Sequence, residues 1–129
     1  MTETVKLIVT ILLIAVQILT AIVAVVKGLT KRKTSKHLSK VEQENDLYDY
    51  MVNETANMER FAKVIKNSMT KDELSKYKRD TVMKNMTLYA RANGYSWYDE
   101  SVWGNELTKY IEQANATAGK VTAVKSSAN

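Results

Sequence analysis

The sequence predicts an all-α protein with one N-terminal transmembrane helix, followed by an amphipathic, coiled-coil-like helix and a small helical hairpin. Three observations predict this fold class. Residues 7–26 contain no charged residue, no glycine and no proline. Between residues 38 and 114, apolar residues recur at intervals of three, four or seven, as they do on the buried face of a helix. A capping-box pattern at Thr70 and an Asn-Gly pair at residues 93–94 mark a helix start and a helix stop.

The apolar run at residues 7–26 is long enough to cross a membrane. A helix rises about 1.5 Å per residue, so a run of this length spans about 30 Å, which matches the hydrocarbon core of a bilayer. A helix buried in so small a domain would not need to be apolar on all sides. The competing interpretation is a cleaved secretory signal. It is disfavoured because Glu3 offsets Lys6 in the N-terminal segment and because the apolar run is longer than in most such signals.

Five segments follow from this pattern. We expect a transmembrane segment at 1–27, a polybasic linker at 28–37, an amphipathic helix at 38–69, a helical hairpin at 70–116 and a disordered tail at 117–129.

Basic residues crowd the C-terminal side of the apolar run, whereas Lys6 stands alone on the other side. Positively charged flanks stay on the cytoplasmic side of a membrane. We therefore expect a single-pass protein of the cytoplasmic (inner) membrane, with the N-terminus outside and the C-terminus in the cytoplasm. The same residues are candidates for contact with anionic lipid head groups. They are Lys27, Lys31, Arg32, Lys33 and Lys36.

The expected helix at 38–69 carries a broad apolar stripe. Its acidic residues are interpreted as a solvated face rather than as a catalytic pair. The stripe comprises Val41, Tyr48, Val52, Thr55, Ala62, Ile65 and Met69, widened by Leu47, Met51, Met58 and Phe61.

In the hairpin, Thr70 and Glu73 form the capping box of the first helix, and Gly94 ends it. Either Ser96 or Asp99 caps the last helix. A hairpin of this size is small for an independent core, so the preceding helix or further copies of the chain must cover its apolar stripe. We therefore expect a homo-oligomer. The apolar faces comprise Leu74, Tyr77, Val82, Met86, Tyr89 and Ala90, then Val102, Trp103, Leu107, Tyr110, Ile111 and Ala114.

No pattern in the sequence predicts an enzyme. The single histidine, His37, lies among lysines, and no phosphate-binding or dinucleotide-binding glycine pattern is present. The chain has no cysteine, which excludes thiolate metal sites and fits a reducing compartment. We expect no catalytic residue, no cofactor, no metal site and no small-molecule substrate.

Nucleic-acid binding is the main alternative for the soluble part. Lys76, Lys78, Arg79 and Lys84 fall on one expected helix together with tyrosines. Basic side chains contact phosphates, and aromatic side chains stack on bases. Acidic residues are interleaved with the basic ones, so a solvated amphipathic helix explains the pattern more simply.

The order of these pieces resembles the family of small single-span phage holins typified by a Lactobacillus phage holin. The resemblance rests on a lysine-rich helix at 76–92, a glycine turn at 93–94, a short polar segment at 96–100, and a last helix from 102 that ends near Ile111 and Glu112. It implies a protein that oligomerises in the cytoplasmic membrane and opens a lesion leading to host lysis. In lipid, spans associate through small and polar side chains. Thr10, Gln17 and Thr20 are therefore the candidate residues for span association.

Two other functions stay open. The first is a membrane-anchored organiser that binds DNA or a replication or assembly complex. The second is a structural membrane protein of a virion or cell envelope.

Overall fold

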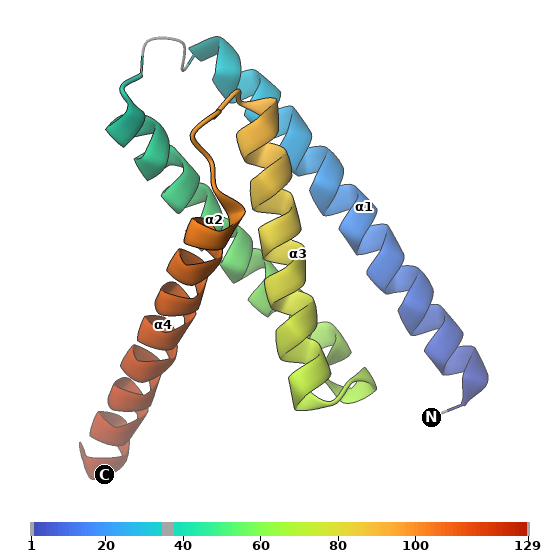
Figure 1. The fold of residues 1–129 in the computed structure, drawn as a ribbon. Helices are drawn as coiled ribbons and strands as arrows, with labels where there is room; N and C mark the ends of the chain where they lie inside the picture. Colours follow the sequence, from blue (N-terminus) through green and yellow to red (C-terminus); the bar gives the residue numbers. More distant parts are fainter. Residues whose placement is uncertain (1, 35–37, 129) are drawn as a thin grey trace. The chain divides into compact units, whose positions relative to one another are not determined.

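The computed structural model describes residues 2–34 and 38–128, with side chains for 2–31 and 38–117 (Figure 1). These described residues form four α-helices and one 3₁₀ turn, and contain no strand. The predicted all-α class, with a long apolar helix at the N-terminal end, is confirmed. The elements are α1 (Glu3–Thr34), α2 (Lys40–Ile65), η1 (Lys66–Ser68), α3 (Lys71–Ala92) and α4 (Glu100–Ala128).

The chain divides into two compact units, Met1–Tyr98 and Asp99–Asn129. The first unit holds α1, α2 and α3, and α3 packs against both of the other helices. The second unit holds α4. The segment 70–116 contains α3 from the first unit and part of α4 from the second, and its assignment as a helical hairpin stays a prediction.

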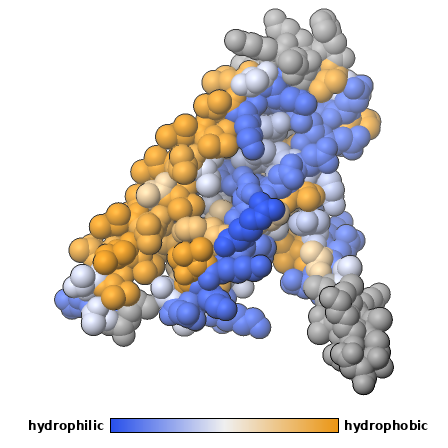
Figure 2. All heavy atoms as spheres, turned by 180° about the vertical axis from the view of Figure 1, so that it is seen from behind, coloured by the Kyte–Doolittle hydropathy of each residue, from blue (hydrophilic) through white to orange (hydrophobic). Residues whose placement is uncertain are grey.

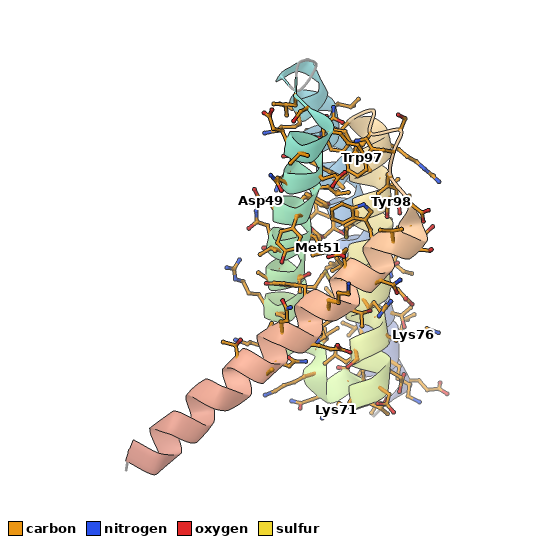
Figure 3. All side chains as sticks on the ribbon, turned by 60° about the vertical axis from the view of Figure 1, so that its left-hand side comes forward. Asp49, Met51, Lys71, Lys76, Trp97 and Tyr98 are labelled. Atoms are coloured by element: carbon orange, nitrogen blue, oxygen red, sulfur yellow. The ribbon has the colours of Figure 1, made fainter. Side chains whose placement is uncertain are left out.

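The core of the first unit lies between α2 and α3. Leu47, Met51 and Met86 are fully buried there. In Figure 3, Met51 points from α2 into the interior, whereas Asp49 points away from it. The full set of buried α2 residues is Leu47, Tyr50, Met51, Glu54, Met58, Ala62 and Ile65.

The buried face of α2 is therefore rotated from the predicted stripe. Val41 is 66% exposed and Tyr48 is 38% exposed, although both were expected in the centre of the stripe. The residues expected only to widen the stripe, such as Leu47 and Met51, form its centre instead. The rotation brings the carboxylate of Glu54 into the core, where it is 5% exposed.

Side chains cap α2 and α3 at their starts. The Thr70 hydroxyl accepts a hydrogen bond from the Glu73 amide at 3.2 Å, and the Thr70 amide donates to the Glu73 carboxylate at 3.4 Å. The capping box predicted at Thr70 is thus confirmed. A second capping box joins Ser39 and Glu42 at the start of α2, which the sequence analysis had not identified.

At its C-terminal end, α3 stops at the predicted glycine. Gly94 has a φ angle of 78°, in the left-handed region that glycine adopts most readily. The Tyr95 amide donates to the Ala90 carbonyl at 2.9 Å, and the Gly94 amide donates to the Arg91 carbonyl at 3.1 Å. This pair of bonds is the Schellman motif, which satisfies the last carbonyl groups of a helix.

Asp99, rather than Ser96, caps α4. Its carboxylate accepts from the amides of Ser101 at 2.9 Å and Val102 at 3.3 Å. Two helices also run further than expected. α4 continues to Ala128 through the predicted tail, and α1 continues to Thr34 through the first part of the predicted linker. No proline or positive-φ glycine interrupts either helix, so the backbone hydrogen bonds continue.

Replacing Met86 by alanine is expected to destabilise the first unit by about 2–5 kcal/mol, because the fully buried side chain leaves a cavity. Chemical denaturation of the full chain in mild detergent, followed by circular dichroism, measures the change. Val64→Ala is the control, because Val64 is 76% exposed. Equal midpoints for the two variants would contradict the core assignment.

Candidate membrane-contacting surface

Helix α1 is long and apolar enough to cross a membrane. Its candidate span is Glu3–Lys31, and only 6% of its most apolar stretch is buried. A soluble protein rarely leaves so large a continuous apolar surface open, and such surfaces mark contact sites for membranes or proteins.

Between Val5 and Leu29 the outward side of α1 is apolar. Each large hydrophobic residue on it is at least 40% exposed. Figure 2 shows these residues gathered as one continuous hydrophobic band along the helix. The band suits the hydrocarbon of a bilayer, because it has no hydrogen-bonding side chain to leave unsatisfied. It comprises Leu7, Ile8, Ile11, Leu12, Ile14, Ile18, Leu19, Ile22, Val23, Val26 and Leu29.

The three candidate residues for span association lie together on the opposite side. At 100° per residue, Thr10, Gln17 and Thr20 fall within a sector of about 80°. Gln17 and Thr20 are half-buried, and the Thr20 hydroxyl donates to the Gln17 carbonyl at 3.3 Å. The exposed Thr10 hydroxyl donates to the Lys6 carbonyl at 2.9 Å. We call this side the polar side of α1.

The polar side of α1 faces α3, and the two helices run parallel. Near one end, a Cβ atom added to Gly28 would lie 2.8 Å from the Ala92 Cβ and 2.8 Å from the Tyr89 carbonyl oxygen. Further along, the Tyr77 hydroxyl donates to the Leu13 carbonyl at 3.5 Å. Gly28 is therefore required for this approach, because any side chain there would push α3 away.

At the other end, a cavity of about 280 Å³ separates α1 from η1 and the start of α3. Its lining includes Thr10, Lys6 and Glu73. The two helices are therefore in closest contact near Gly28.

A carboxylate cluster holds the C-terminal end of α1 to α2 and α3. Asp46 accepts hydrogen bonds from the hydroxyls of Tyr89 at 2.6 Å and Tyr95 at 2.7 Å. The Asn93 amide group donates to the same carboxylate at 3.4 Å, and the Lys31 ammonium lies 3.5 Å from its other oxygen. The Asp46 side chain is 16% exposed, so these contacts are only weakly screened by water.

A second acidic residue, Glu54, lies deeper. It accepts a hydrogen bond from the Asn85 amide group at 2.8 Å. Next to it, the rings of Tyr50 and Tyr89 stack with centroids 4.1 Å apart. Burial and the nearby Glu54 charge raise the pKa of Tyr50. Burial and the hydrogen bond to Asp46 raise the pKa of Tyr89.

The sequence analysis missed Asp46 and Glu54, because it assigned all the acidic residues of this helix to a solvated face. One signal was present for Glu54, which follows Met51 by three residues and precedes Met58 by four. A cavity of about 370 Å³ opens beside both carboxylates and is lined from α1 by Lys27 and Lys31.

The structure describes the side chains of two of the five basic residues expected at lipid head groups. Lys27 is exposed, and Lys31 is paired with Asp46. The side chains of Arg32 and Lys33, and the whole of Lys36, lie outside the described residues.

Three of the four basic residues considered for nucleic-acid contact lie on the exposed side of α3, because at 100° per residue Lys76, Arg79 and Lys84 fall within a sector of about 140°. Lys78 is directed to another side. The Lys78 ammonium lies 2.7 Å from the Glu59 carboxylate, on α2. Lys76 and Lys71 extend outward from the first half of α3 (Figure 3). Arg79 is also exposed. The exposed carboxylates of Glu73 and Asp80 lie on the same side of α3, so the basic residues do not form an uninterrupted positive strip that could follow a phosphate backbone.

In the part of the chain that the structure describes, no group of three or more His, Cys, Asp or Glu side chains could hold a metal ion. Comparisons with models of protein families, with curated proteins and with solved structures find no match. Fold and surface define an all-α protein with one helix long and apolar enough to span a membrane.

The packing of α3 on α1 conflicts with a bilayer around both helices. Because α3 lies alongside α1 from Leu13 to Gly28, a bilayer that enclosed the pair would also enclose the ionic side chains of α3. Each costs about 2.5–3.5 kcal/mol at the bilayer centre. Either α1 lies at the membrane surface with its apolar band in the lipid, or it crosses without α3. The ionic residues are Lys76, Lys78, Arg79, Asp80, Lys84 and Arg91.

Alkaline pH is expected to destabilise the first unit. Tyr50 and Tyr89 have a pKa raised above the ordinary 10.0, so the folded state keeps protons that the unfolded state releases. The contribution of these two tyrosines to stability should be complete below pH 10 and fall as the pH rises above it. Denaturation midpoints measured between pH 8 and pH 11 test this.

The variant Tyr50→Phe should make the alkaline loss of stability smaller. Tyr48→Phe is the matched control, because it removes a more exposed hydroxyl from the same helix. An alkaline loss that Tyr50→Phe leaves unchanged would argue against a role for the buried hydroxyl.

Proposed function

We propose that this protein permeabilises the cytoplasmic membrane in the manner of a phage holin, with α1 as its membrane-spanning part. The observation that carries the proposal is the two-sided character of α1. Its apolar band is open along the helix, and its polar side chains lie together on the other side. Copies of the chain accumulate in the membrane, associate through their spans and open a lesion that leads to host lysis.

The two sides of α1 suit two different neighbours. The apolar band faces lipid. The polar side faces other spans, because an amide or hydroxyl in hydrocarbon favours a hydrogen-bonding partner. Gln17 lies near the middle of the span, between Thr10 and Thr20. Hydrogen bonds between copies at these positions would line a lesion with polar groups, and this step needs no catalytic residue.

The orientation of the span follows from its charges. Five basic residues follow the apolar run, so the C-terminal helices lie in the cytoplasm and the N-terminus lies outside. Exposed side chains such as Lys27 contact anionic head groups there. The residues are Lys27, Lys31, Arg32, Lys33 and Lys36.

The two alternatives receive less support. A membrane-anchored organiser would need a basic surface for DNA, and acidic side chains such as Asp80 are interleaved with the basic residues on the exposed side of α3. An envelope or virion component would need a protein partner in fixed stoichiometry, and purification from membranes in mild detergent would reveal one.

Expression of the full chain in bacteria is expected to collapse the membrane potential and viability abruptly. The loss should require the span, so a chain that lacks residues 1–30 should leave the potential intact. A potential-sensitive dye and colony counts measure both effects. Cells that keep their potential while the full chain is abundant in the membrane would contradict the holin function.

The variant Gln17→Leu is expected to weaken oligomers in detergent by roughly 5- to 30-fold, the range for one interhelical hydrogen bond of about 1–2 kcal/mol. Cross-linking at graded protein concentrations measures the change. Ala15→Leu is the control, because Ala15 lies on the exposed side of α1. Oligomers unchanged by Gln17→Leu would remove Gln17 from the mechanism.

A further inference from the structure

Helix α3 covers the side of α1 that the proposed function assigns to span association. Ala24 is fully buried on that side, and Gly28 touches the backbone of α3. Leu13 accepts a hydrogen bond from Tyr77 on the same side. Gln17 and Thr20 lie between these two points of contact and are half-buried. In a single folded chain, the polar side of α1 is therefore already occupied.

Helix α3 cannot keep this position inside a bilayer. Exposed ionic side chains of α3, including Lys76 and Lys84, lie at the level of the apolar run. An α1 helix that crosses the bilayer has therefore left α3, and its polar side has become uncovered.

We propose that α3 and the α1 helix of a second copy compete for the polar side of α1, so that α3 masks the span until it is released. The inference rests on the proposed function, in which copies associate through their spans. It adds that within each chain α3 covers the side of α1 through which two copies would associate, so that the contact between α1 and α3 is autoinhibitory.

The second copy of α1 fits the uncovered side better than other parts of the chain. Residues 7–26 carry no charge, so another α1 can lie at the depth from which α3 is excluded. Thr20, Ala24 and Gly28 follow one another at intervals of four, which places them in one row. Small residues in such a row allow two helix backbones to approach closely in lipid. α3 already uses the same row for its own close approach at Gly28.

Several contacts hold α1 in the masked position. They include the packing at Ala24 and Gly28, one hydrogen bond from Tyr77, and the Lys31–Asp46 ion pair at 3.5 Å. Near the start of α3 the cavity beside Thr10 separates the helices. A bilayer competes with α3 for α1 because it accepts the apolar band and excludes the ionic side chains of α3.

The absence of cysteine from the chain gives a direct test. Thr20→Cys places a single thiol on the polar side, and Ile18→Cys places one in the apolar band, where Ile18 is 56% exposed. The full-length proteins are reconstituted in phospholipid vesicles and oxidised, and the disulfide-linked dimer is measured. Thr20→Cys is expected to form several-fold more dimer than Ile18→Cys. Equal yields would overturn the proposal.

A bulky substitution on α3 distinguishes the masking of α1 by α3 from the association of two α1 helices. Ala92→Phe, added to the Thr20→Cys chain, removes the space that α3 needs beside Gly28 without changing α1. It is expected to raise the dimer yield at least twofold and to speed its formation. Ala92→Ser is the matched control, because serine is small enough to keep the contact. A dimer yield that Ala92→Phe leaves unchanged or lowers would overturn the masking role of α3.

The opposite change is made on α1. Gly28→Leu obstructs both α3 and a second α1, so it should lower the dimer yield below that of the parent Thr20→Cys chain. A dimer yield raised by Gly28→Leu would contradict the shared surface. Circular dichroism of each variant checks that the helices persist. Depolarisation by the full chain is measured separately. If the full chain depolarises bacteria but Ala92→Phe leaves the dimer yield unchanged, the masking by α3 is refuted and the proposed function is not.

Discussion

An ionic side chain is costly in hydrocarbon, and this constraint separates α1 from the rest of the molecule. The run at residues 7–26 is uncharged, whereas α3 beside it carries both basic and acidic side chains. The two helices pack well as long as water reaches the outer side of α3. Once lipid surrounds the pair, at about 2.5–3.5 kcal/mol for each ionic group, the packing is no longer favourable. The fold therefore holds α1 in a position that a membrane can disrupt.

The polar contacts among α2, α3 and the turn that follows do not depend on α1. Asp46 receives its two shortest hydrogen bonds from Tyr89 and Tyr95, and Glu54 receives one from Asn85. All of these residues lie in α2, α3 or the turn that follows. Among the described side chains of α1, Lys31 reaches Asp46. These polar groups thus hold α2 against α3. Asp46 and Glu54 each keep a hydrogen-bonding partner when α1 leaves.

The sequence predicted what local chemistry determines and missed what distant contacts determine. The capping box at Thr70, the stop at Gly94 and the apolar character of α1 each depend on neighbouring residues, and each was confirmed. The burial of Glu54 depends on Asn85, 31 residues away, so charge alone suggested a solvated position. Thr10, Gln17 and Thr20 were predicted from their polar side chains alone, and that α3 covers the side of α1 on which they lie follows only from the tertiary packing.

The continuity of α1 up to Thr34 has a mechanical consequence. Residues 27–34 add about 12 Å of helix beyond the apolar run, at about 1.5 Å per residue. The head-group layer on one side of a bilayer is about 5–7 Å thick. A spanning α1 would therefore end in water, above the head groups. This rigid helical extension would set the distance from the membrane surface at which the following segment begins.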